Sequence, residues 1–200
     1  VLAGEVVTMS VDWEHIPAKH RSLIKAFLDE ADMSADAIKT VDFPPVYGAD
    51  IVVSCEKAKD PKNGSIYLKP TQFVLGIGCR RDTAFENIVR AIRQSLLKLQ
   101  IDISDIDMIA SIDVKKDEPG IKEFCERNRI DFVTYTADEL MAVQGEFSAS
   151  QFVREHVGVD NVCERAAVLA CSRECNKAGE LIYKKHKYDS VTVAAARYPD

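Results

Sequence analysis

Residues 73–97, with the sequence FVLGIGCRRDTAFENIVRAIRQSLL, decide the fold of this chain. They begin with the continuous apolar run Phe73–Gly78, which is typical of a strand buried on both faces. Thr83 and Glu86 follow at the spacing of a capping box, so we expect a helix to begin there. The apolar residues of this helix recur at helical spacing and form one stripe: Phe85, Ile88, Val89, Ile92 and Leu96. The stretch therefore predicts a strand followed by a helix that packs on the same sheet.

The same alternation of strand and helix continues toward the C-terminus. The patterns predict strands at Ile106–Ile112 and Asp131–Tyr135, a second capping box at Thr136–Glu139, and helices at Glu118–Asn128, Ser148–Val157 and about Val162–Cys171. Consecutive β-α units imply a mostly parallel sheet. Leu181–Tyr183 and Val191–Ala196, joined across the basic turn Lys184–Lys187, predict an antiparallel pair at one side. We therefore expect an α/β fold, with a mostly parallel sheet flanked by helices and an antiparallel pair near the C-terminus.

Residues 1–70 are more weakly patterned and predict a small α/β segment that precedes this fold. The expected elements are a helix at Ala18–Ala31, a short helix after Ser34, a strand at Ala49–Ser54 and a strand at Ser65–Leu68. The last strand is expected to pair back onto the one before it across the polar turn Lys57–Gly64. We place the domain boundary close to Pro70, which gives the parts 1–70 and 71–200.

The composition excludes several classes of protein. With 46% hydrophobic and 29% charged residues, the 200-residue chain is typical of a soluble globular protein. The net charge of −6 argues against nucleic acid as a partner, and no apolar run is long enough to cross a membrane. The six cysteines follow no secretory signal, so we expect reduced thiols and a cytoplasmic location. Their spacing matches no metal knuckle, so we expect no metal site.

The end of the first predicted strand is the first candidate site. Ligands of open α/β sheets bind beyond the carboxyl ends of the strands, and Gly76 and Gly78 would let the backbone approach a ligand there. A helix start also offers free amides to an anion. The third glycine of a dinucleotide motif is absent, because Arg81 occupies that position. Nucleotide binding, simple packing of the glycines and an anion site remain open, and we favour an anion site in which Arg80 or Arg81 binds a carboxylate beside Cys79.

Acidic residues form the second candidate site. Asp113, Lys115 and Glu118 follow the second predicted strand, and Glu164 stands three residues after Asn161. Each glutamate fits two roles, a support for the first turn of a helix or a general base. The basic residues near positions 80–93 and 184–187 fit either solvated faces or contacts with an anionic ligand.

Four segments resemble one known family when they are taken in order. LGIGCRR (75–81), IDVKKDEPG (112–120), SQFVREHVGVDNVCERAA (150–167) and VTVAAAR (191–197) resemble the C-terminal domain of the CbiG family of cobalamin-biosynthesis proteins, the cobalt-precorrin 5A hydrolases. ADIVVS (49–54) and YLKP (67–70) resemble the central segment and linker of that family. The resemblance places family motif positions on Gly76, Gly78, Cys79, Arg80, Asp113, Lys115, Glu118, Ser150, Glu164 and Lys185.

The resemblance implies a tetrapyrrole substrate. In that family a δ-lactone of cobalt-precorrin 5A is hydrolysed and acetaldehyde is released, with other corrin-pathway enzymes as possible partners. The implied roles are a general base at Glu118 or Glu164 and carboxylate clamps at Arg80 and Lys185. The cobalt belongs to the substrate, so no cofactor is expected. A stand-alone relative, CobE, implies an alternative, in which the chain binds or carries a corrinoid intermediate without catalysis.

Overall fold

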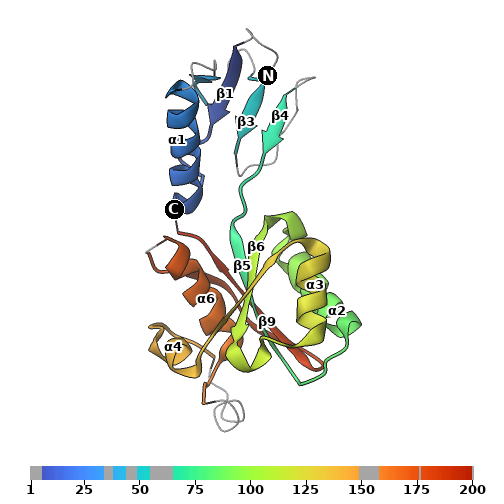
Figure 1. The fold of residues 1–200 in the computed structure, drawn as a ribbon. Coiled ribbons are helices and arrows are strands. Elements are labelled where there is room, and N and C mark those ends of the chain that lie inside the picture. Colours follow the sequence, from blue (N-terminus) through green and yellow to red (C-terminus); the bar gives the residue numbers. More distant parts are fainter. Residues whose placement is uncertain are drawn as a thin grey trace. The chain divides into compact units, whose positions relative to one another are not determined.

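A computed structural model describes residues 6–33, 38–43, 49–54, 65–148, 158–175 and 177–199. The chain divides into two compact units, unit 1 over Val1–Thr71 and unit 2 over Gln72–Pro199 (Figure 1). Each unit has its own sheet, and the two sheets are called sheet A and sheet B below.

Unit 1 contains four parallel strands in the order β2-β1-β3-β4. The strands are β1 (Val7–Val11), β2 (Ile38–Val41), β3 (Ile51–Val53) and β4 (Ile66–Leu68), and helix α1 (Ala18–Met33) flanks them. The core is small because the strands are short. It consists of Met9, Val11, Ile16 and Val53, with Ile24 and Leu28 of α1 packed against it.

Two predictions for unit 1 are wrong. The short helix expected after Ser34 is not seen in the described residues, since Ile38–Val41 forms strand β2. The strand that begins near Ser65 does not pair back in an antiparallel hairpin; Ile66 pairs with Ile51 in a parallel register. A parallel pair requires a crossover of about a dozen residues rather than a tight turn. The predicted turn Lys57–Gly64 lies outside the described residues.

Sheet B of unit 2 has the order β7-β6-β5-β9-β8. Its strands are β5 (Phe73–Cys79), β6 (Ile106–Ile112), β7 (Asp131–Tyr135), β8 (Glu180–Tyr188) and β9 (Val191–Arg197). The first three are parallel, and β9 runs antiparallel between β5 and β8. The predicted α/β class and antiparallel pair are therefore confirmed. The predicted basic turn is wrong, because Lys184–Lys187 lies within β8 and the chain turns at Asp189, where φ is 46°.

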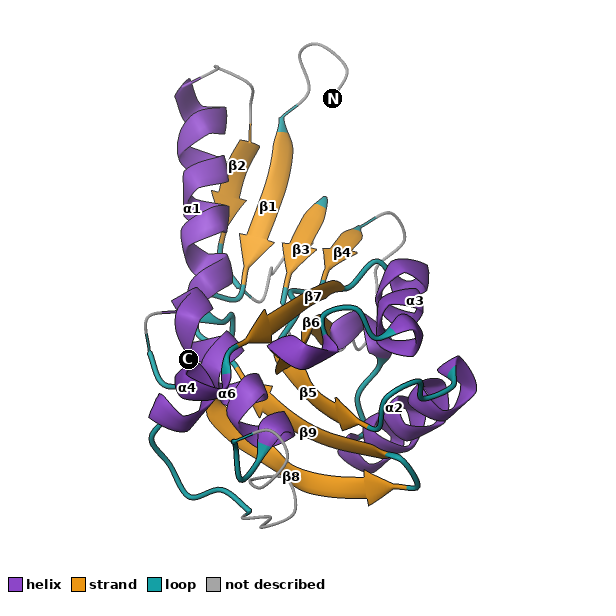
Figure 2. Cartoon of the chain, turned by 60° about the horizontal axis from the view of Figure 1, so that its bottom comes forward, coloured by secondary structure: helices purple, strands orange, loops and turns teal. Residues whose placement is uncertain are grey.

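Helices cover both faces of sheet B, as Figure 2 shows. Helices α2 (Phe85–Leu99) and α3 (Pro119–Asn128) pack on one face, and α4 (Ala137–Ala142) and α6 (Val162–Cys175) pack on the other. The first face is filled by bulky aliphatic side chains such as Leu75 and Ile92. The second is filled mainly by small residues, including Ala166, Ala167 and Ala170, all fully buried. The predicted helix Ser148–Val157 lies almost entirely outside the described residues.

One of the two predicted capping boxes is present in the structure and the other is not. Thr136 and Glu139 form the predicted box at α4, with reciprocal hydrogen bonds of 3.3 Å and 2.7 Å. The box predicted at Thr83 is wrong. Helix α2 begins one residue later, after Ala84, and the Thr83 amide donates to Glu118 Oε1 at 3.0 Å instead. A carboxylate from a distant segment thus replaces the local partner.

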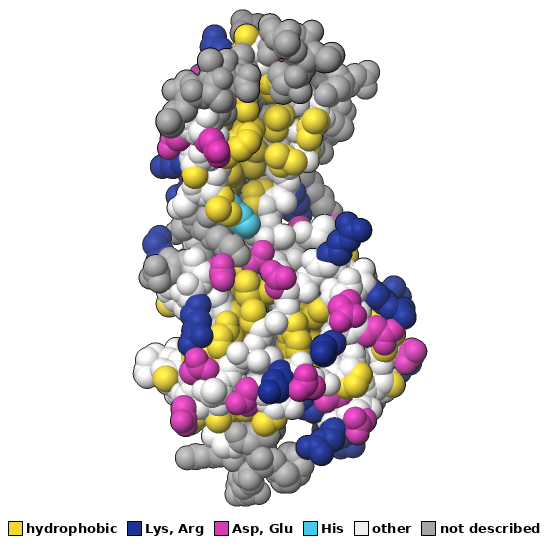
Figure 3. Space-filling model, in the orientation of Figure 1, with side chains coloured by type: hydrophobic (Ala, Val, Ile, Leu, Met, Phe, Trp, Pro, Cys, Tyr) yellow, Lys and Arg dark blue, Asp and Glu magenta, His cyan; other side chains and the backbone are white. Residues whose placement is uncertain are grey.

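The surface of unit 2 carries mixed charges. On the face visible in Figure 3, Lys and Arg side chains alternate with Asp and Glu side chains, and hydrophobic side chains gather on the visible face of unit 1. Among the helices that the structure describes, none combines the length and apolar character needed to cross a membrane.

Candidate functional site

The candidate site is the edge of sheet B at which β5 and β6 end. We call it the carboxyl rim and define it by Cys79–Thr83 after β5, Asp113–Glu118 after β6, the start of α6 and the facing residues Lys185 and Thr192. Parallel strands β5 and β6 bring the first two segments to one edge. This is the edge at which open α/β sheets bind ligands.

Gly76 is required for packing. A Cβ atom built on Gly76 would lie 1.7 Å from the carbonyl oxygen of Cys163, the second residue of α6. The helix backbone therefore lies directly on the strand. A Cβ on Gly78 would meet only the Thr192 hydroxyl, at 2.7 Å, and that hydroxyl donates to the Gly78 carbonyl at 3.1 Å. Of the roles left open for this glycine pair, close packing explains Gly76.

Glu118 joins the segments that follow β5 and β6. Its side chain is 4% exposed, its Oε2 accepts from Lys115 Nζ at 2.9 Å, and its Oε1 accepts from the Thr83 amide at 3.0 Å. Although Glu118 is the N-cap residue of α3, its side chain makes no capping hydrogen bond there. Glu118 thus stands at the start of α3, as predicted, but its hydrogen bonds go to Lys115 and to the approach to α2.

Cys79 lies beside this ion pair. Burial raises the pKa of the Cys79 thiol to about 11, while the nearby positive charge of Lys115 acts in the opposite direction. A thiol with such a pKa is protonated at neutral pH, and the protonated form is a poor nucleophile and a poor metal ligand. The described residues contain no cluster of three or more His, Cys, Asp or Glu side chains arranged to hold a metal ion.

Glu164 is the third residue of α6. Its side chain is fully buried, and Asn161 Oδ1 accepts from its amide at 2.9 Å, so the predicted N-cap is confirmed. The carboxylate does not return to Asn161. It accepts from the amide and hydroxyl of Ser148, both at 2.8 Å, and from the amide of Lys185 at 2.6 Å. Glu164 thus holds Ser148, which lies between α4 and α6, against Lys185 of β8.

Both glutamates have donors on each carboxylate oxygen. A general base must reach the proton that it removes, directly or through one water molecule. Carboxylates that are buried and accept hydrogen bonds on both oxygens are better suited to hold loops in place. Glu118 and Glu164 therefore have the geometry of positioning residues. Their partners Thr83 and Ser148 were not predicted as site residues, although Ser148 stands at a predicted helix start.

The remaining predicted residues lie nearer to solvent. Arg80 and Arg81 are exposed, and Asp113 is half-buried with its Oδ1 accepting from the Val114 amide at 2.7 Å. The expected free amides before α2 are partly occupied, because the Arg80 amide donates to the Ser190 carbonyl at 3.0 Å. The Arg80 amide is thus not free to bind an anion, whereas the arginine side chains remain available to a ligand. Ser150 lies outside the described residues.

Comparison with known proteins adds to this geometry. Residues 73–196 match the family model described as Cobalamin synthesis G C-terminus. The cobalt-precorrin-5A hydrolase of Salmonella typhimurium is 34% identical over 126 residues, which cover 63% of this chain and 34% of that protein. The probable cobalt-precorrin-5A hydrolase of Methanocaldococcus jannaschii is 32% identical over 137 residues, covering 66% of this chain and 42% of that protein.

A solved structure agrees with part of this chain in fold. The crystal structure of CobE, a protein from the cobalamin (vitamin B12) biosynthetic pathway, has a TM-score of 0.59 at 25% identity, covering 62% of this chain and 89% of that chain. The chain spans 34% and 42% of the length of the two hydrolases, so it corresponds to part of them. The family match lies within unit 2, includes the carboxyl rim and takes in more than half of the chain. The chain therefore belongs to the Cobalamin synthesis G C-terminus family.

Proposed function

We propose that this chain acts in cobalamin biosynthesis as part of a cobalt-precorrin-5A hydrolase, with the carboxyl rim of unit 2 as the corrinoid site. The observation that supports this most strongly is the family match over residues 73–196, which contains every described residue of the rim. In the proposed reaction, water opens the δ-lactone of cobalt-precorrin 5A and acetaldehyde leaves. The substrate brings its own cobalt, so the proposal includes no resident metal or cofactor.

The exposed cations of the rim are the proposed contacts for the substrate. Corrinoid intermediates carry carboxylates around the ring, and arginine binds carboxylates with two parallel hydrogen bonds. Arg80 and Arg81 are exposed and adjacent, whereas Lys115 is already paired with Glu118. Exposed ion pairs contribute only about 0–1 kcal/mol each, so several contacts must act together.

Glu118 and Glu164 are proposed to shape this rim. Glu118 fixes the segment that carries Arg80 and Arg81 through the Thr83 amide, and Glu164 fixes Ser148 against β8. Replacement of either by Gln would then lower stability and activity in parallel. A fully stable Gln variant that has lost turnover would instead identify that glutamate as the general base.

The proposal is tested by incubating the chain anaerobically with cobalt-precorrin 5A and measuring acetaldehyde. We expect acetaldehyde release, and we expect the double variant Arg80→Gln/Arg81→Gln to raise KM by about 10-fold, which corresponds to about 1.4 kcal/mol of lost binding. Arg93→Gln is the matched control, since Arg93 is exposed on α2 outside the rim. If acetaldehyde is absent and the corrinoid spectrum does not change on mixing, the proposed function is refuted.

A second function is favoured by the match with CobE. The match covers 89% of that protein's chain but 62% of this chain. Together with the buried, hydrogen-bonded carboxylates of Glu118 and Glu164, this extent fits a domain that binds or carries a corrinoid, in contact with other corrin-pathway enzymes of the cytoplasm. A change in the corrinoid spectrum without acetaldehyde release would support this second function over hydrolysis.

A further inference from the structure

Arg165 is a buried cation at the start of α6 that the proposed function does not use. It is the fourth residue of α6, directly follows Glu164, and is 8% exposed. An arginine side chain stays charged in proteins, so a buried one needs hydrogen-bond acceptors around it. The acceptors that surround Arg165 therefore show which part of the fold its charge serves.

The guanidinium of Arg165 contacts both ends of the connection between α4 and α6. Its Nε and Nη2 donate to the two carboxylate oxygens of Asp160, at 2.8 Å and 3.2 Å. Its Nη1 donates to the carbonyl of Val143 at 2.9 Å and to that of Leu140 at 3.3 Å. The Cζ atom lies 4.5 Å from the centre of the Phe147 ring. One side chain thus holds the beginning and the end of this connection.

The two carbonyls belong to the C-terminal end of α4. The last carbonyls of a helix have no amide partner further along the helix, and a cation near them is favourable. Leu140 lies in the last turn of α4, and Val143 is its C-cap residue. Arg165 therefore fixes the point at which the chain leaves α4.

Glu164 holds the same connection from the neighbouring position of α6. Its carboxylate accepts from the amide and hydroxyl of Ser148, and Asn161 Nδ2 donates to the Ser148 carbonyl at 2.8 Å. Phe147, which contacts the Arg165 guanidinium, directly precedes Ser148. Two consecutive buried residues of opposite charge thus hold one segment against the start of α6, which belongs to the carboxyl rim.

Stability alone is a weak explanation for this arrangement. The desolvation of a buried ion pair roughly cancels its attraction, and apolar residues often replace such a pair without loss of stability. The best-attested use of buried charges is to select one arrangement of the chain over others. A guanidinium suits that use because its donors form a rigid planar fork, whereas a lysine ammonium is a point charge on a flexible stem.

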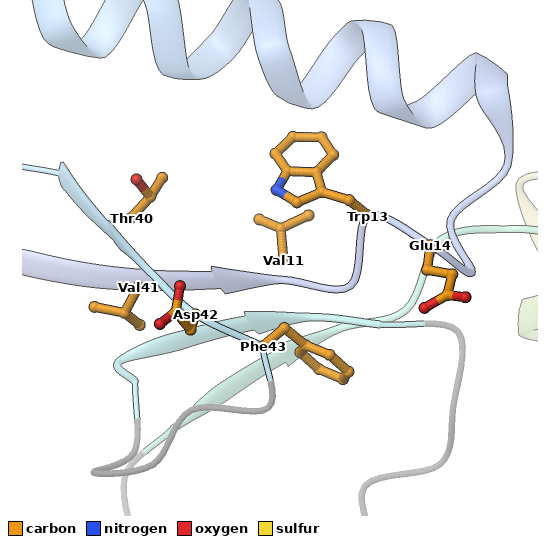
Figure 4. A pocket seen from close by; sticks show the side chains of 7 residues that line it. All are labelled: Val11, Trp13, Glu14, Thr40, Val41, Asp42 and Phe43. Carbon is orange, nitrogen blue, oxygen red and sulfur yellow. The ribbon is translucent and has the colours of Figure 1, made fainter.

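Buried and oriented charges distinguish this place from the pocket of unit 1. That pocket has a volume of about 370 Å³ and lies at the carboxyl ends of β1 and β2 (Figure 4). Its polar side chains, Glu14, Thr40 and Asp42, are all exposed. A binding site needs a few polar groups held in fixed directions. In the start of α6, by contrast, both charged side chains are buried and their directions are fixed by hydrogen bonds.

We propose that Arg165 is a positioning residue of the corrinoid site, which sets the place of Phe147 and Ser148 at the carboxyl rim. This inference rests on the proposed function, because it assigns the held segment to the shape of the site at which the corrinoid binds. Arg165 itself is buried and is not proposed to touch the substrate. It acts through the end of α4, Asp160 and Phe147.

The first measurement needs no substrate. Amide hydrogen exchange is followed by NMR in the full chain, in Arg165→Lys and in Arg165→Met. We expect the Val143 and Ser148 amides to exchange at least about 10-fold faster in both variants, as for the loss of one hydrogen bond to a charged group, while the β5 amides keep their rates. Arg173→Gln is the matched control, because Arg173 lies on the same helix and pairs with Glu139 of α4 at an exposed position.

The second measurement separates positioning from mere stabilisation. In the acetaldehyde assay, a loss of folded molecules lowers the apparent kcat and leaves KM unchanged. A displaced wall of the site instead weakens binding, so we expect Arg165→Lys to raise KM by about 10-fold with kcat little changed. Arg173→Gln should keep the wild-type KM. If the chain binds the corrinoid without turnover, Kd from the spectral change takes the place of KM.

Arg165→Lys keeps the charge and most of the length of the side chain, so it is expected to fold, and circular dichroism checks this for both variants. The inference is overturned if the Ser148 amide exchanges at the wild-type rate in the folded variants. It is also overturned if exchange is faster but KM, or Kd, keeps its wild-type value. A wild-type chain that neither releases acetaldehyde nor changes the corrinoid spectrum refutes the proposed function instead, and the exchange rates then still decide whether Arg165 holds the connection.

Discussion

Replacement of Gly76 by Ala tests the packing that forms the carboxyl rim. The added Cβ would lie 1.7 Å from the Cys163 carbonyl oxygen and 2.6 Å from its carbonyl carbon, whereas an ordinary contact begins at 3.4 Å. These are backbone atoms of α6, so no side-chain rotation can relieve the clash. Helix α6 or strand β5 must therefore move by well over an ångström.

That displacement has a large energetic cost. The buried side chains of α6 include Ala166, Ala167 and Ala170, which are too short to fill a gap that a displaced helix would leave. Overpacked cores lose about 1–3 kcal/mol and occasionally more, so we expect a loss of about 3 kcal/mol from unit 2. At about 4 °C per kcal/mol for a domain of this size, Tm should fall by about 12 °C.

The measurement is urea denaturation followed by circular dichroism, with fluorescence of Trp13, the single tryptophan, as a reference in unit 1. Gly78→Ala is the matched control. Its Cβ meets only the Thr192 hydroxyl, which can rotate at the cost of one hydrogen bond, about 1 kcal/mol. If Gly76→Ala is as stable as the wild type, or loses no more stability than Gly78→Ala, the packing argument is refuted.

Three further predictions concern buried or capping groups. Glu164→Gln places the side-chain amide of glutamine where the carboxylate accepts three hydrogen bonds, so we expect urea denaturation to show a loss of about 1–3 kcal/mol in the free energy of unfolding. Unchanged stability would contradict the positioning role of Glu164. Burial raises the pKa of Cys79 to about 11 and of Cys163 to about 12, so both should react with iodoacetamide at pH 8 at least ~10²-fold more slowly than in the denatured chain, as peptide mass spectrometry would measure. Because the pKa values of both thiols in the folded chain exceed the ordinary value of 9.0, their contribution to the free energy of unfolding is complete below pH 9 and is lost as the pH rises toward 12. Equal alkylation rates in the folded and the denatured chain would contradict the burial of these thiols. Thr136→Ala removes the capping box of α4 and should cost about 1 kcal/mol, and an unchanged denaturation midpoint would show that the box contributes nothing.

Strand β6 of unit 2 was predictable because burial on both faces leaves a mark in the sequence, whereas in β7 only Tyr135 is buried. β6 and β7 begin and end where their apolar patterns predict, at Ile106–Ile112 and Asp131–Tyr135. The strands of unit 1 lack this mark. In β2, Lys39 and Thr40 are exposed, and all three residues of β4 are exposed. Their sequences therefore lack the alternation of apolar and polar residues that distinguishes a strand from a loop.

The candidate site was less predictable than the fold because its contacts are distant in sequence. Thr83 and Glu86 have the spacing of a capping box, yet the Thr83 amide is taken by Glu118, 35 positions away. Asn161 caps Glu164 as its spacing predicts, but the carboxylate of Glu164 reaches Ser148, 16 positions away. Local spacing identifies which residues stand at the rim. Only the fold determines which oxygen meets which donor.

These distant contacts explain how the loops of the rim keep their shape. The segment after β5 contains exposed arginines and little apolar surface, so the hydrophobic effect cannot hold it. A buried carboxylate can do so, because leaving it without donors is costly and the surrounding amides must therefore stay in place. Glu118 holds the amide of Thr83, and Glu164 holds the amides of Ser148 and Lys185. Each glutamate thus fixes the position of backbone amides at the edge where open α/β sheets generally bind ligands.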